Sequence, residues 1–242
     1  MKSNLIIAVL LILQAYAVQA QDKASGVPLI GSKAPSFSAA STEGILHFPE
    51  DFGRSWKILF SHPRDFTAVC TSEVLELAHM QEEFESLGVK FAIVSNDDVV
   101  THEKWKESIE SIMKPEDKAA GIRFPLVADT QREISSLYGM IHQESRDVRY
   151  VRGVFIIDPG NIIQAISFYP MQVGRNLEEV IRTVQALQTA DAHGSTPVNW
   201  KPGDDLLLPA SPYLNPAVKA DSLLTEQYYN LGGILWYKKQ AQ

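Results

Sequence analysis

Residues 56–71 read WKILFSHPRDFTAVCT, and they contain a strand, a loop and the start of a helix. The run 56–60 is mostly apolar and is typical of a strand, which we expect to end near His62. Beyond Cys70, apolar residues recur at helical spacing up to Gly88, a residue that favours helix ends. These apolar positions are Val74, Leu75, Leu77, Ala78, Phe84 and Leu87. The stretch therefore predicts a strand followed by a helix that begins around Cys70 to Thr71.

The same alternation of strand and helix patterns extends on both sides of this stretch and predicts an α/β domain with a central sheet. Several of the strand candidates are short and apolar throughout, as is usual for strands that are covered on both faces of a mixed or parallel sheet. The strand candidates are 56–60, 89–94, 125–127, 153–157 and 162–166, and the further helix candidates are 99–113 and 177–187.

The length of 242 residues predicts one main domain with a small appendage. We place the main domain at 27–191 and a C-terminal extension at 192–242, where prolines and glycines become frequent. The extension contains Trp200, Tyr213 and Trp236, so we expect it to pack on the main domain or on a partner subunit. The chain has 29 acidic and 22 basic residues and no basic stripe with interleaved aromatics, so nucleic acid is not an expected partner.

The N-terminus has the pattern of a signal peptide, which we place at residues 1–20. Lys2 precedes an apolar run of nine residues, 5–13, and small residues follow up to Ala20. We expect cleavage after Ala20 or, as the alternative, after Ala17. Nine apolar residues are too few for a membrane-spanning helix, which needs about 20. The prediction is a secreted, extracellular protein, with the lumen of the endoplasmic reticulum as the alternative location.

Cys70 is the only cysteine of the chain, so no internal disulfide can form. Composition alone favours a buried, inert thiol. Its predicted position at a helix N-terminus favours a reactive thiolate instead, because unpaired N–H groups and the helix dipole stabilise negative charge there. The Thr67 hydroxyl could donate to the sulfur and accept from a substrate, or it could simply cap the helix. Spacing alone leaves both interpretations open.

Resemblance to a known family decides between them. Pro63-x-x-x-Thr67-x-x-Cys70 matches the active-site motif of peroxiredoxins, and residues 60–71 resemble the one-cysteine class, including its mammalian member. The resemblance continues through 34–37, 95–97, 124–129, 169–176 and 196–204. It implies a thioredoxin-like fold in which helices flank a central mixed sheet. It also implies a homodimer in which the C-terminal extension folds over the partner subunit.

The resemblance further implies a thiol-dependent peroxidase that reduces hydrogen peroxide and organic hydroperoxides. Cys70 is then the attacking thiolate, Thr67 and Arg152 hold the peroxide, and Pro63 fixes the loop. His62 and Arg175 would help to shape the site. The product is a sulfenic acid on Cys70. Because the chain has no second cysteine, an external thiol such as glutathione or a thioredoxin-like protein must resolve it.

Three alternatives use other features. Residues 53–57, GRSWK, occupy the place of a lipase-like Gly-x-Ser-x-Gly motif in the mammalian relative, but Lys57 replaces the second glycine, and Pro49 stands where that relative has a histidine. Ser55 is thus a weak candidate for a phospholipase nucleophile. A binding, signalling or chaperone protein could use the same fold. Cys70, His62 and His79 lack any recognised metal-ligand spacing, so we expect no metal site, and the chain shows no nucleotide or flavin motif that would imply a cofactor.

Overall fold

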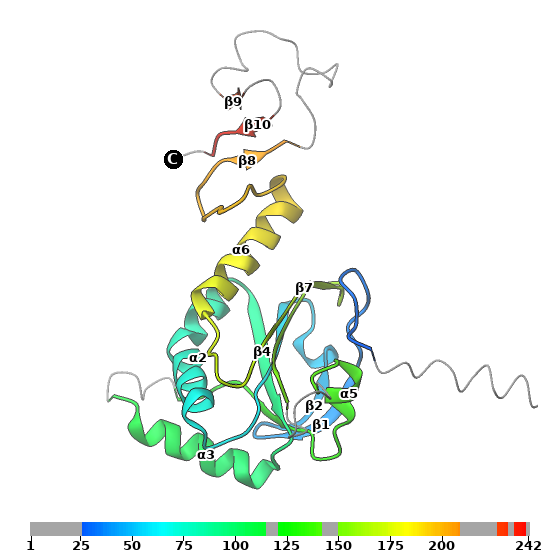
Figure 1. Ribbon diagram of the computed structural model, residues 1–242, viewed down its shortest axis with the longest axis vertical. Helices are drawn as coiled ribbons and strands as arrows, with labels where there is room; N and C mark the ends of the chain where they lie inside the picture. The colour runs from blue at the N-terminus through cyan, green and yellow to red at the C-terminus, as the bar shows by residue number, and fades with distance from the viewer. Residues whose placement is uncertain (1–25, 115–120, 142–149, 209–226, 232–234, 241–242) are drawn as a thin grey trace, which may run out of the picture.

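A mixed β-sheet forms the centre of the protein (Figure 1). The computed structural model describes residues 26–114, 121–141, 150–208, 227–231 and 235–240. Within these residues the central sheet has seven strands in the order β2-β1-β5-β4-β3-β6-β7. The strands are β1 (Phe37–Ser41), β2 (Gly44–Phe48), β3 (Trp56–Ser61), β4 (Val89–Ser95), β5 (Leu126–Ala128), β6 (Arg152–Ile157) and β7 (Ile163–Tyr169).

The middle of the sheet is parallel and its flanks are antiparallel. Strands β3, β4 and β5 run parallel, whereas β6 pairs with β3, and β7 with β6, in the antiparallel sense. The five strands expected from the sequence are all present, and the sheet is mixed. The hairpin β1–β2 was not predicted. Its strands are short and have alternating or largely exposed side chains, so they lack the continuous apolar run that marks a central strand.

Side chains that alternate along β3 fill two separate cores, one on each face of the sheet. Ile58 and Phe60 face the helices α2 (Ala68–Ser86), α3 (Val99–Ile112) and α6 (Leu177–His193). Leu59 faces the other core, which is covered by the β1–β2 hairpin, the 3-10 helix η1 (Glu50–Phe52) and the short α5 (Glu133–Leu137). Figure 1 shows the long helices on one side of the sheet and α5 on the other. Coverage on both faces explains why the central strands are apolar throughout.

The three helices predicted from apolar spacing are confirmed as α2, α3 and α6. Helix α2 begins two residues earlier than expected, at Ala68, with Thr67 at its N-cap position. Its C-terminal end follows the prediction, because Gly88 adopts the left-handed conformation (φ 68°) and its N–H donates to the carbonyl of Glu85 at 2.9 Å. The short helix α5 has no apolar period long enough to be detected in the sequence.

The described part of the C-terminal extension forms a small lobe beyond the end of α6 (Figure 1). Its strands β8 (Leu206–Leu207), β10 (Leu235–Lys238) and β9 (Tyr228–Leu231) form a second, three-stranded antiparallel sheet within the described residues. Trp200 and Trp236 are buried, as their apolar character suggested, whereas Tyr213 lies outside the described residues. The predicted signal peptide, residues 1–20, also lies outside them. Among the helices that the structure describes, none has the length and apolarity needed to cross a membrane.

Candidate active site

Cys70 lies in the first turn of α2, where the loop that follows β3 enters the helix. Thr67 has extended backbone angles at the N-cap position, and the first bond of the helix runs from the Thr71 N–H to the Thr67 carbonyl. The N–H groups of residues 68–70 therefore have no partner within the helix, in the same turn that carries Cys70. Cys70 is fully buried in the core beneath the helices. A thiolate here is stabilised by the N-terminal end of α2.

Arg152, the first residue of β6, supplies a fixed positive charge next to this sulfur. Its Nη1 lies 3.3 Å from Sγ of Cys70, and its side chain is almost completely buried. The Nε and Nη2 groups both donate to the carbonyl oxygen of Met171, at 3.1 and 2.6 Å. The guanidinium is therefore held on two sides, which fixes its position relative to the sulfur. A buried cation at this distance favours the ionised thiol and any negative charge that develops beside it.

Glu73 holds Arg152 in place, and the sequence analysis missed it. Its Oε2 accepts from Nη1 of Arg152 at 2.8 Å, the same nitrogen that approaches the sulfur. Burial alone would raise the pKa of Glu73, but the charge and hydrogen bonds of Arg175, together with the charge of Arg152, hold it below its ordinary value. Glu73 is thus a buried carboxylate. The signal in the sequence was its position three residues after Cys70, which places both side chains on one face of the helix.

Arg175 completes this cluster without reaching the sulfur in the described contacts. Its Nε and Nη2 donate to the two carboxylate oxygens of Glu73 at 2.9 and 2.7 Å. Its Nη1 donates to the backbone carbonyls of Ser61 and Gly153, both at 3.0 Å. These bonds tie α2 to the ends of β3 and β6. The structure therefore places Arg175 as a support for Glu73 and, through it, for Arg152.

The other two residues of the motif lie in the loop before α2. Pro63 is buried, whereas Thr67 is half-buried. The Thr67 hydroxyl donates to the carbonyl of Arg64 at 3.0 Å and makes no capping bond to the helix. The expected donation from Thr67 to the sulfur is therefore not observed. The oxygen of this hydroxyl still has lone pairs that can accept a hydrogen bond.

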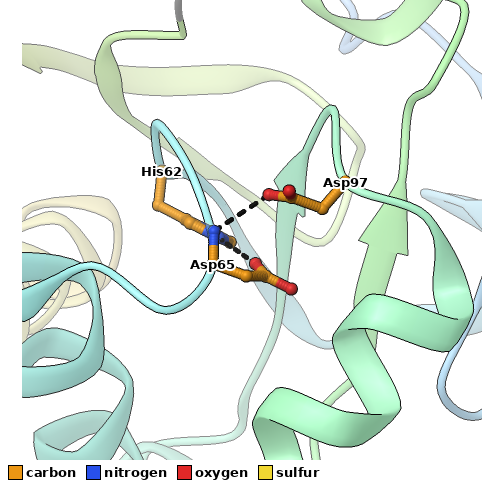
Figure 2. A group of neighbouring side chains, drawn as sticks. All are labelled: His62, Asp65 and Asp97. Carbon is orange, nitrogen blue, oxygen red and sulfur yellow. Dashed lines mark hydrogen bonds and ion pairs between the residues drawn. The ribbon is translucent and has the colours of Figure 1, made fainter.

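His62 lies away from the arginines, in a second buried cluster of the same loop. Its Nε2 is 2.7 Å from Oδ1 of Asp65, and the backbone N–H of Asp65 donates to Asp97 at 2.9 Å. Figure 2 shows these three side chains between the loop and the end of β4. Their ligand-type atoms lie within 4.8 Å of one another. Each of these residues is engaged in hydrogen bonds, however, including donation from Ser95 to Asp97, and hydrogen bonding accounts for the cluster. His79 lies on the surface of α2 beside Glu76, apart from this cluster.

Comparisons with known proteins agree with this geometry. Residues 30–166 match the family model of the AhpC/TSA family, and residues 186–220 match that of the C-terminal domain of 1-Cys peroxiredoxin. A peroxiredoxin of Methanosarcina mazei is 44% identical over 76% of this chain and 84% of its own length. The chain belongs to the one-cysteine peroxiredoxins.

Relatives of this peroxiredoxin include a mitochondrial member. The mitochondrial peroxiredoxin of Saccharomyces cerevisiae is 43% identical over 75% of this chain and 71% of its own length. A solved structure of a yeast mitochondrial 1-Cys peroxiredoxin, described for its thiol resolution via glutathione/thioredoxin systems, has a TM-score of 0.76 and 38% sequence identity. The match between the two chains covers 88% of this chain and 100% of the solved chain. Like its family, the chain is a thiol-dependent peroxidase with a single cysteine.

Ser55, the alternative nucleophile of this peroxiredoxin, lies at the other end of β3 from the Cys70 loop. It precedes Trp56, the first residue of the strand, whereas His62 follows the last residue. Six strand residues at about 3.3 Å each separate the two ends by roughly 20 Å. The buried ammonium of Lys57 donates to the backbone carbonyls of Ser55 and Asp158, at 2.9 and 3.5 Å. Lys57 therefore has a structural role at this end of the strand, and Ser55 is remote from the peroxidase site.

The titration of His62 predicts a loss of stability below neutral pH. Burial lowers the pKa of His62 and outweighs the opposing effects of Asp65 and Asp97, while the charge of His102 adds to the lowering. As pH falls below about 6.5, the unfolded chain gains a proton at this residue that the folded chain does not. The free energy of unfolding then decreases by up to about 1.4 kcal/mol per pH unit until the folded-state pKa is reached. Urea unfolding of the wild type and of His62→Gln across this range measures the effect. A wild-type curve with the same pH slope as the variant would contradict it.

Proposed function

We propose that Cys70 attacks the terminal oxygen of a hydroperoxide as a thiolate. The S–O bond forms as the O–O bond breaks, the sulfur is oxidised to a sulfenic acid, and the peroxide is reduced to water or an alcohol. The departing oxygen takes up a proton. The observation that carries the proposal is the 3.3 Å approach of Arg152 Nη1 to Sγ at the N-terminal end of a helix. Hydrogen peroxide and organic hydroperoxides are the proposed substrates.

The surrounding residues take separate roles in this proposal. Arg152 stabilises the thiolate and the negative charge on the departing oxygen. Thr67 accepts a hydrogen bond from the peroxide, because its own proton is donated to the carbonyl of Arg64. Glu73 and Arg175 are positioning residues that act through Arg152. Pro63 and His62 hold the loop.

An external thiol regenerates Cys70, since this is the only sulfhydryl of the chain. By analogy with the yeast relative, we propose glutathione or a thioredoxin-like protein as the reductant. Without added thiol, we expect purified protein to consume a single equivalent of peroxide per chain and then stop. Adding reduced glutathione, or thioredoxin with its reductase, restores continuous consumption. Coupled absorbance assays with each reductant in turn measure this. Continuous turnover with no thiol present would contradict the proposal.

We also propose that the mature protein is secreted. Lys2, the apolar run 5–13 and the small residues up to Ala20 support this location. N-terminal sequencing of protein recovered from the medium of expressing eukaryotic cells tests it. A chain that starts at Gln21 is expected, or at Val18 if cleavage follows Ala17. Retention of the uncleaved chain inside the cells is the contrary result.

A homodimer is the proposed assembly. Two observations support it: β7 is an edge strand of the central sheet, and the lobe beyond α6 projects away from the main domain (Figure 1). The extension also exposes the apolar side chains of Val198, Leu231 and Leu235, which a second subunit could cover. Light scattering of the purified protein gives the mass in solution, and a monomer at all concentrations would overturn the proposal.

A further inference from the structure

The loop that leads into the Cys70 helix is connected to α3 through a buried carboxylate that the peroxidase chemistry does not use. Asp65 accepts from His62 through Oδ1 and from His102 of α3 through Oδ2, each at 2.7 Å. All three side chains are essentially inaccessible to solvent. We propose that Asp65 and His102 are positioning residues for Cys70, and this proposal rests on the proposed function.

The backbone next to Asp65 shows why the loop needs to be held. Phe66 has a φ of 56°, in the left-handed region that a bulky residue rarely adopts, and its side chain is 57% exposed. Such a backbone conformation is strained and persists only where its surroundings fix it. The ring of Phe66 lies 6.5 Å from the ring of Trp105 in α3, but it is mostly exposed, so this contact alone does not fix the backbone. Asp65 does, because both carboxylate oxygens and the backbone N–H are hydrogen-bonded.

Helix α3 contacts the loop and α2 at a second point, one turn after His102. The Trp105 Nε1–H donates to Oγ1 of Thr71 at 3.1 Å, and its ring lies 5.0 Å from the ring of His62. Thr71 is the neighbour of Cys70. Helix α3 therefore holds both the loop and the first turn of α2. A shift of Asp65 would be transmitted to Cys70 across only five residues of a short loop and helix start.

The hydrogen bonds also fix the form of each imidazole. Burial alone would raise the pKa of Asp65, but the bonds from His102 and His62 lower it, so the carboxylate is ionised and acts only as an acceptor. His62 must then donate from Nε2 and His102 from Nδ1. The remaining nitrogens, Nδ1 of His62 and Nε2 of His102, are buried and have no hydrogen-bond partner among the described residues. A proton on either of these two nitrogens would have no acceptor among the described residues, which favours the tautomers named above.

This difference in the donating nitrogen provides a selective test. The amide nitrogen of Asn is the same number of bonds from Cα as Nδ1 of histidine, and that of Gln matches Nε2. At position 102, Asn therefore keeps the bond to Asp65 and Gln misplaces it. At position 62 the pattern is reversed. His47, an exposed histidine whose Nδ1 lies 3.3 Å from Asp51, provides the control at a distance from the loop.

The experiment measures six variants, with Asn and Gln placed in turn at positions 102, 62 and 47. One readout is the second-order rate of peroxide reduction, and the other is the rate of Cys70 alkylation as a function of pH. We expect His102→Asn and His62→Gln to retain most of the wild-type rate. His102→Gln and His62→Asn should lose up to about 100-fold, the effect of displacing a reacting group by about 1 Å. In these two, half-maximal alkylation should also move to higher pH, while both His47 variants match the wild type.

Equal behaviour of Asn and Gln at positions 102 and 62 would overturn the proposal. Alkylation of Cys70 needs no peroxidase activity, so it tests the positioning role separately from the proposed function. A wild type that consumes no peroxide contradicts the proposed function. The positioning role is tested by the alkylation rates of the Asn and Gln variants. If the mismatched variants fail to fold, nitrogen-detected NMR of the histidines in the wild type decides. The Nε2–H form of His62 and the Nδ1–H form of His102 at neutral pH are required, and either opposite form contradicts the proposal.

Discussion

Replacing Cys70 with serine is expected to abolish peroxide reduction. Serine has nearly the same shape as cysteine, but its hydroxyl remains protonated at neutral pH and is a far weaker nucleophile. Removal of an enzyme's nucleophile generally costs several orders of magnitude in rate. We therefore expect the Cys70→Ser variant to consume peroxide, in the presence of a thiol, no faster than buffer with that thiol. A peroxide electrode or a coupled assay measures both rates side by side.

The fold of this variant should be intact, which makes the result specific to the chemistry. Cys70 is buried beside Arg152, and a serine hydroxyl at the same place can also accept from that guanidinium. Circular dichroism and the thermal unfolding midpoint of the two proteins provide the check. If Cys70→Ser kept a substantial part of the thiol-dependent activity, the assignment of the reacting atom would be wrong.

Replacing Arg152 with methionine is expected to produce the second largest loss, about 100-fold to 1000-fold in the second-order rate with peroxide. This is the usual effect of removing one preorganised donor that stabilises developing charge. Methionine fills a similar volume but removes the charge next to the sulfur. Arg152→Lys restores a charge but cannot donate at once to Met171 and toward Cys70, as the arginine does. It should fall between the wild type and Arg152→Met.

Arg182→Met is the matched control for this experiment. Arg182 also forms a two-point ion pair, with Glu179, but on the partly exposed surface of α6, where its Nη1 donates to the carbonyl of Trp200 at 3.1 Å. Its replacement should leave the peroxide rate unchanged. Stopped-flow measurements on the three variants and the wild type test the whole series. Equal rates for Arg152→Met and the wild type would remove Arg152 from the mechanism, even if both proteins were equally stable.

Much of the fold could be predicted from the sequence, because the central strands and long helices have clear apolar patterns. The runs at 56–60 and 89–94 lie in the middle of the sheet and are buried on both faces, so they stand out. The β1–β2 hairpin has no such pattern, since many of its side chains face solvent. The strands of the C-terminal lobe are only two to four residues long, which is too short for a reliable period.

The site was only partly predictable from the sequence. The residues that were not predicted are recognised only through contacts with residues far away in the chain. Cys70, Thr67 and Pro63 lie within one motif, and Arg152 could be located by family resemblance. Glu73 looks like an ordinary helix-surface carboxylate until the two buried arginines are seen against it.

The contact between Asp65 and His102 could not be predicted from the sequence either. The two residues are separated by 37 positions in the chain and meet only because β4 and α3 return beside the loop. Neither residue belongs to a motif with fixed spacing. Long-range hydrogen bonds of this kind leave no periodic signal in a single sequence.

The central claim is that Cys70 is oxidised once by peroxide and restored by a thiol from outside the chain. Intact-mass spectrometry of the reduced protein after one equivalent of hydrogen peroxide, with peptide mapping, tests it most directly. The predicted result is the gain of one oxygen atom at Cys70, which is lost again on addition of glutathione or of thioredoxin with its reductase. An unchanged mass at Cys70, or an oxygen found only on methionine, would contradict the account.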